Sequence, residues 1–189
     1  MSLGILVVED EAAHALSLQQ SLNALGHRVL GLARDGREAC RLRRQLVPDL
    51  VLMDIRLPIL DGLKAAEAMN RQSPLPVVLV TSHADRIFLE RARRAGVCSY
   101  LLKPVETAVL GPAIDLACQN FRRVRELERQ VVDLREELRA RKLIERAKGI
   151  LMERRHIDEA TALARLQEAA RQRGVSLVSE AELVIAAGG

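Results

Sequence analysis

The sequence predicts an α/β protein: a doubly wound, five-stranded parallel sheet, followed by a coiled-coil helix and a small all-α domain of three helices. Five short apolar segments alternate with helical patterns in the first part of the chain. An almost unbroken helical pattern then runs to residue 155, and two shorter ones follow. The 189 residues suffice for one domain or two small ones. We place the three parts at residues 1–121, 122–140 and 141–189.

The predicted strands are short, continuous apolar runs that end abruptly at polar residues. Such runs are typical of strands that are buried on both faces of a parallel sheet. We expect them at residues 3–8, 28–33, 49–53, 76–80 and 97–102, the last being the weakest.

Helical periodicity fills the intervals between these strands. Gly26 and Gly96 end two of the helical patterns, where glycine readily takes the left-handed conformation of a helix cap. Ligands of a doubly wound sheet bind at the carboxyl ends of its strands, and its crossovers are right-handed. The helices are expected at residues 12–25, 36–46, 62–71 and 85–95.

Polar residues follow four of the five strands. Glu9 and Asp10 end the first strand, Asp54 the third and Thr81 the fourth, while Lys103 follows the fifth. Each residue alone has an ordinary explanation; Asp10, for example, could cap the next helix. Together, three crowded carboxylates would repel one another unless a cation joined them, and Mg²⁺ is the expected ion. A carboxylate there can attack phosphorus while the metal and Lys103 neutralise the phosphoryl charge.

These residues stand in segments that resemble the receiver domain of two-component response regulators. The resemblance covers residues 3–118 and implies a flavodoxin-like fold, the doubly wound sheet already expected. The matching segments are Val7–Glu11, Leu50–Pro58, Asp61-Gly62, Thr81-Ser82 and Tyr100–Pro104.

The resemblance also implies a role for each matched residue. Asp54 is the expected phosphoacceptor, and a sensor histidine kinase is its expected phosphodonor. Thr81 and Tyr100 are the expected switch residues that respond to the phosphoryl group. Lys103 is expected at the site, with a cis peptide bond to the proline that follows it. The implied Mg²⁺ ligands are Glu9, Asp10, Asp54 and the main-chain carbonyl of Arg56.

The long helical pattern carries an apolar seam with three- and four-residue spacing. This spacing predicts a short coiled coil, and a receiver offers no surface to cover such a seam. We expect a homodimer through the helix at 117–138; the alternative is that the C-terminal helices cover the seam within one chain. The seam residues are Ala117, Val124, Leu127, Val131, Leu134 and Leu138.

Positive charge is concentrated on the next stretch of helix. Residues 122–156 hold 12 basic and 7 acidic residues, while residues 1–121 hold 14 and 13. Aromatic residues end at Phe121, which excludes nucleic-acid readers that stack bases on aromatic rings. Gly149 lies inside a helical pattern at a cost of about 1 kcal/mol relative to alanine. Close approach of another backbone, from protein or nucleic acid, would justify it.

The tail resembles the ANTAR domain, an RNA-binding output module of response regulators and transcription antiterminators. The matching residues are the segment 141–152 (Arg-Lys-Leu-Ile-Glu-Arg-Ala-Lys-Gly-Ile-Leu-Met), Asp158–Ala160, Leu163 and Leu166. The resemblance implies that a dimer binds paired RNA stem-loops in leader transcripts and causes transcription antitermination. The expected RNA-binding residues are Arg141, Lys142, Arg146, Ala147, Lys148, Gly149, Arg154 and Arg155.

Cellular context and function class follow from what the sequence lacks. It shows neither a signal peptide nor an apolar run of membrane-span length, and its three cysteines form no CxxC pair. We expect a cytoplasmic regulator that has no membrane partner and is not an enzyme. The alternatives are a DNA-binding response regulator and a dimeric one that contacts only proteins.

Overall fold

The computed structural model of the chain describes residues 2–82 and 86–188. The chain divides into two compact units, Met1–Arg125 and Glu126–Gly189. Each unit has a hydrophobic core of its own.

The first unit contains a five-stranded parallel sheet with the strand order β2-β1-β3-β4-β5. Every residue of β1, β3 and β4 is buried, as their uninterrupted apolar sequences indicate. The predicted sheet is confirmed. Its strands are β1 (Gly4–Val8), β2 (Arg28–Ala33), β3 (Leu50–Asp54), β4 (Val77–Thr81) and β5 (Ser99–Leu102).

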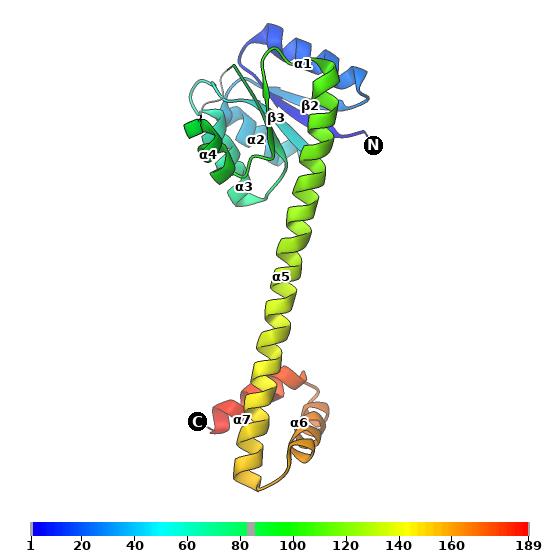
Figure 1. Cartoon of the computed structure of the whole chain (residues 1–189), viewed down its shortest axis with the longest axis vertical. Helices are drawn as coiled ribbons and strands as arrows, with labels where there is room; N and C mark the ends of the chain where they lie inside the picture. The colour runs from blue at the N-terminus through cyan, green and yellow to red at the C-terminus, as the bar shows by residue number, and fades with distance from the viewer. Residues whose placement is uncertain (1, 83–85, 189) are drawn as a thin grey trace. The chain divides into compact units, whose positions relative to one another are not determined.

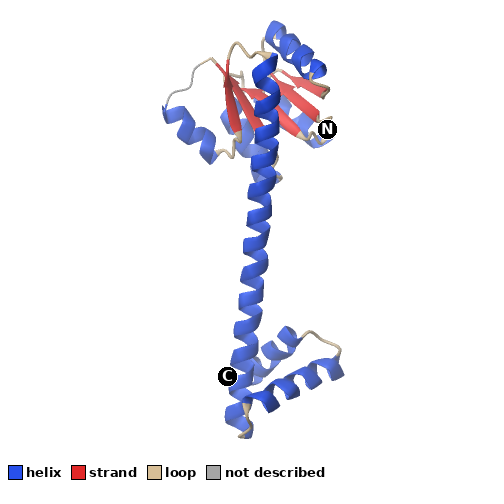
Figure 2. Cartoon of the chain, turned by 45° about the vertical axis from the view of Figure 1, so that its right-hand side comes forward, coloured by secondary structure: helices blue, strands red, loops and turns tan. Residues whose placement is uncertain are grey.

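Helices cover both faces of this sheet (Figure 1). Successive residues of a strand point to opposite faces, so the central strands β1, β3 and β4 each supply side chains to two cores. One core contains side chains of α1 and the start of α5, and the other those of α2, α3 and α4. Figure 2 shows the strands, in red, between these helices. The first four helices are α1 (Ala12–Ala24), α2 (Gly36–Leu46), α3 (Gly62–Gln72) and α4 (Arg86–Arg94).

Local sequence signals fix the ends of several helices. Gly26 and Gly96 have φ angles of +80° and +73°, which confirms their left-handed conformation. Asp61 caps α3 by accepting a hydrogen bond from the Lys64 N–H. At Gly62 a side chain would place its Cβ 2.1 Å from the main-chain oxygen of Asp54, so only glycine fits beside the end of β3. The predicted helix at 85–95 begins at residue 85, which lies outside the described residues.

One continuous helix, α5 (Thr107–Arg155), contributes to both units. Leu110, Ile114 and Ala117 are fully buried in the core of the first unit. The prediction that Ala117 belongs to the coiled-coil seam is therefore wrong. Residues with the same three- and four-residue spacing pack the start of the helix against the sheet. The exposed part of the seam begins at Val124.

The second unit packs the end of α5 against α6 (Glu159–Arg173) and α7 (Leu177–Gly188). Its core is small: Ala147, Leu166 and Ala181 are its fully buried apolar centre. Asp158 caps α6 by accepting a 2.7 Å hydrogen bond from Thr161, and Gly174 ends that helix at φ +65°. Among the described residues, none of the helices combines the length and the apolar character that a membrane span requires.

Candidate functional site

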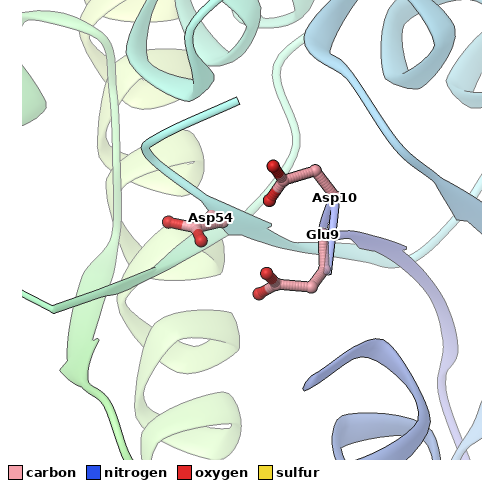
Figure 3. A group of neighbouring side chains, drawn as sticks. All are labelled: Glu9, Asp10 and Asp54. Atoms are coloured by element: carbon pink, nitrogen blue, oxygen red, sulfur yellow. The ribbon is translucent and has the colours of Figure 1, made fainter. Parts of the chain in front are cut away.

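Three carboxylates meet at the carboxyl end of the sheet. Glu9 and Asp10 follow β1, Asp54 ends the neighbouring β3, and their oxygens lie within 4.8 Å of one another. Figure 3 shows the three side chains turned toward a common space. Glu9 and Asp54 are buried, whereas Asp10 is exposed. Glu11, rather than Asp10, occupies the N-cap of α1, and it makes no side-chain cap hydrogen bond. Helix capping therefore does not explain Asp10.

Lys103 reaches this cluster from the loop after β5. Its Nζ donates hydrogen bonds to Glu9 Oε2 at 2.7 Å and to Asp54 Oδ2 at 2.5 Å. The peptide bond to Pro104 is cis, as the resemblance implies. The other oxygen of Asp54, Oδ1, accepts hydrogen bonds from the Ile55 N–H at 2.5 Å and the Arg56 N–H at 3.2 Å. Both Asp54 oxygens are thus held in a fixed orientation.

The site carries more negative charge than Lys103 can balance. Burial, above all, raises the pKa of Glu9 above its ordinary 4.5; the hydrogen bond from Lys103 opposes this shift and the charge of Asp54 adds to it. Burial also disfavours the Lys103 ammonium, but its hydrogen bonds to Asp54 and Glu9 outweigh burial and raise its pKa. Among the described side chains, Glu9 Oε1 is a buried oxygen without a hydrogen-bond partner. A divalent cation with oxygen ligands fits this arrangement.

The predicted switch residues occupy different environments. Thr81 is buried at the end of β4, the strand that neighbours the one carrying Asp54. Tyr100 lies on β5 and is 41% exposed. Their positions on adjacent strands place Thr81 near the site and Tyr100 beside it at the sheet edge.

Sequence reasoning missed one side chain at this site. His14 lies on α1, and its Nδ1 is 3.1 Å from Glu11 and 3.7 Å from Glu9 Oε1. The same nitrogen lies 3.5 Å from Lys103 Nζ. The sequence could have indicated His14, because it lies in the first turn of the helix that follows Glu9 and Asp10. That turn begins at the end of the strand and so lies beside the carboxylates.

The expected RNA-binding residues of the second unit fall into two groups. Five basic side chains are exposed, one of which, Arg154, donates a hydrogen bond to the carbonyl of Ala187. They are Arg141, Lys142, Arg146, Arg154 and Arg155.

Two of the three remaining residues require correction. Ala147 is fully buried in the three-helix core, so its side chain has no surface to offer RNA. Lys148 is 6% exposed, and its Nζ binds Glu145 at 2.9 Å and Glu159 at 2.6 Å. Its charge is used to join α5 to the first turn of α6. The environment of Gly149 within this chain does not require a glycine. A Cβ built there meets no atom within 4 Å, so no close approach of another part of this chain excludes a side chain at this position.

Comparisons with known proteins agree with both units. The model of the response regulator receiver domain matches residues 5–115, and the model of the ANTAR domain matches residues 132–185. The transcriptional regulatory protein PdtaR of Mycobacterium tuberculosis is 40% identical over 181 residues, covering 96% of this chain and 88% of its own. The transcriptional regulatory protein AfsQ1 of Streptomyces coelicolor is 34% identical over 110 residues, 58% of this chain and 48% of its own.

Solved structures match the first unit. The signal receiver domain of a modulated diguanylate cyclase from Desulfovibrio desulfuricans superposes with a TM-score of 0.60 at 36% identity. That match covers 65% of this chain and 98% of the other. The chain therefore belongs to the response regulators, and it joins a phosphorylation-controlled receiver domain to an RNA-binding ANTAR domain.

Proposed function

We propose that a sensor histidine kinase phosphorylates Asp54 in the cytoplasm and that Mg²⁺ assists the transfer. The observation that carries this proposal is the group of three carboxylates with Lys103 bound between two of them. Glu9, Asp10, Asp54 and the carbonyl of Arg56 would hold the ion, which supplies positive charge to the phosphoryl oxygens. Lys103 would move from the Asp54 carboxylate to the phosphoryl group and neutralise a further oxygen.

The phosphoryl group would then act on the neighbouring strands. The Thr81 hydroxyl would donate a hydrogen bond to a phosphoryl oxygen, and Tyr100 would turn from its exposed position toward the space behind Thr81. This change would alter the surface around β4 and β5, to which the start of α5 is close in sequence. A ligand shifts such an equilibrium only through different contacts in the two states, and these two side chains supply them.

We also propose that α5 pairs with α5 of a second copy of the chain. The seam from Val124 onward is 45–63% exposed, so α6 and α7 leave it uncovered. The first two a positions hold the β-branched Val124 and Val131, and both d positions hold leucine, which is the order that favours parallel two-stranded coiled coils. The third a position holds Leu138. The exposed seam residues are Val124, Leu127, Val131, Leu134 and Leu138.

The charges beside the seam support a parallel, in-register pair. In such a pair, a g residue of one helix faces the e residue five positions further on the other. With Val124 at an a position, Arg123 faces Glu128 of the partner subunit, and Glu137 faces Lys142 of the partner subunit. Both contacts join opposite charges.

The proposed output is binding to paired stem-loops in leader transcripts, which prevents a terminator hairpin and so causes antitermination. Positive charge on the last third of α5 and the absence of aromatics after Phe121 support contact through charge and shape.

Two assays test this function. The first is incorporation of phosphate from a small phosphodonor with Mg²⁺; labelling that persists in Asp54→Asn would overturn the phosphoacceptor assignment. The second is a gel shift of the phosphorylated chain with a tandem stem-loop leader RNA and with a promoter DNA of equal length. Preference for the DNA would replace the RNA output with a DNA-binding one.

A further inference from the structure

We propose that the RNA-binding surface extends along α5 toward the coiled coil, as a basic stripe of Arg135, Arg139, Lys142 and Arg146 that ends at Gly149. Arg135 and Arg139 lie outside the expected contact residues. This inference rests on the proposed RNA-binding function and assigns it a definite surface.

The five positions lie on one face of the helix. They are separated by four, three, four and three residues, the spacing of neighbours on an α-helix. At 1.5 Å per residue the stripe is about 21 Å long. In the single chain, the four basic side chains line a shallow hollow of about 400 Å³ together with Leu143 and with Leu138, a residue of the proposed dimer seam.

The charge of this stripe is largely unbalanced within the chain. Some other cations of the unit have carboxylate partners: Lys148 binds two glutamates, and Arg173 binds the buried Glu180 at 3.3 Å. Among the described residues, Arg135, Lys142 and Arg146 have no carboxylate within ion-pair distance. Arg139 reaches Glu182 at 3.8 Å, and both side chains are more than half exposed, so that contact is weak.

The stripe ends where acidic residues occur on the same face of the helix. Glu128 lies on the same face two turns before Arg135, and Glu153 lies one turn beyond Gly149. Four cations therefore follow one another without an intervening acid. Their mutual repulsion in the free chain is relieved by a polyanion, whose bound counterions are released at the same time.

Gly149 provides an independent observation. Glycine is a poor helix former, and here a side chain would meet nothing in the free chain. A glycine at the end of a row of cations suits a phosphodiester backbone that approaches the helix closely. Arginine forks also bind phosphate oxygens through two parallel hydrogen bonds.

The charge test uses the full-length chain and a synthetic tandem stem-loop RNA. Arg135→Gln with Arg139→Gln should weaken binding and reduce the slope of log K against log salt by about 1.4 to 1.8, for two lost phosphate contacts. The control, Arg129→Gln with Arg165→Gln, removes the same charge from exposed positions off the stripe. Lys142 is left intact because it also faces Glu137 of the partner subunit in the proposed dimer. Sedimentation confirms that the oligomeric state is unchanged.

The glycine test separates binding from folding. Gly149→Ala should raise Tm by a few degrees, because alanine favours the helix, yet weaken RNA binding at least tenfold. Gln167→Ala, exposed on α6, is the control and should not change RNA affinity.

The outcomes distinguish two failures. If the wild-type chain does not bind the RNA, the proposed function fails and the stripe fails with it. If the wild-type chain binds while the double arginine variant or Gly149→Ala binds equally well, only the stripe is overturned.

Discussion

Lys148 is a cation whose charge serves the fold. Its Nζ lies between Glu145, one turn earlier on α5, and Glu159, in the first turn of α6. Both hydrogen bonds raise the pKa of Lys148, and the hydrogen bond from Lys148 lowers the pKa of Glu159. Lys148 therefore fixes where α6 leaves α5, and Arg146, two residues earlier, is free to serve binding.

Substitution of these two neighbours should give opposite results. Lys148→Gln should lower the Tm of the second unit, because it removes both ion pairs. It should change RNA affinity only at temperatures at which the variant begins to unfold. Arg146→Gln should leave Tm unchanged and weaken RNA binding in a salt-dependent way. Thermal unfolding and RNA titration at 15 °C measure the two effects. If the fully folded Lys148→Gln variant lost as much RNA affinity as Arg146→Gln, Lys148 would be shown to contact RNA directly.

The carboxylate site predicts a pH-dependent response to Mg²⁺. The ion binds ionised carboxylates, and the pKa of Glu9 is raised, so the protonated form persists above pH 4.5. The gain in Tm on adding Mg²⁺ should be small at pH 4.5 and should grow as the pH rises. Asp10→Asn should keep the Tm measured without Mg²⁺ but lose most of the gain. A gain that is independent of pH would place the ion elsewhere.

At the scale of elements, the strand ends could be predicted because the cause is local: an apolar run stops at Glu9 or Asp54, and parallel strands align their carboxyl ends. The burial of Lys148 could not, because it depends on Glu159, eleven residues further on another helix. Ala117 shows a different limit. Its spacing fits the coiled-coil seam, but α5 packs on the sheet before it leaves the first unit, and a periodic pattern does not say which surface it faces.

The charges that flank the seam of α5 can be tested by exchange. Glu137→Lys or Lys142→Glu alone should place like charges opposite each other at two symmetric contacts, at a cost of about 1–2 kcal/mol, or about tenfold in the dimer dissociation constant. The double variant Glu137→Lys/Lys142→Glu should restore dimerisation. Sedimentation equilibrium measures all three, and failure of the double variant to recover would argue against the parallel, in-register pair.

Among the elements that the structure describes, α5 is the one that contributes to both units. Its first turns pack in the receiver core, and its last turns carry the ANTAR core. The proposed pairing of the α5 segment between these two cores would offer a physical route for control, since anything that favours it would bring two RNA-binding surfaces together. Linked sites of this kind gain avidity without any new contact to RNA.

Such control must be reciprocal. If occupation of the Asp54 site raises RNA affinity by some factor, RNA must raise the affinity of that site by the same factor. Beryllofluoride with Mg²⁺, a noncovalent phosphoryl analogue, allows both affinities to be measured at equilibrium. We expect each ligand to tighten the other by about 5- to 150-fold, the usual range of coupling between sites. Leu134→Glu, which disrupts the seam, should retain analogue binding and reduce the coupling to near one. Coupling that survives in this variant would mean that the signal reaches the RNA-binding surface without the dimer.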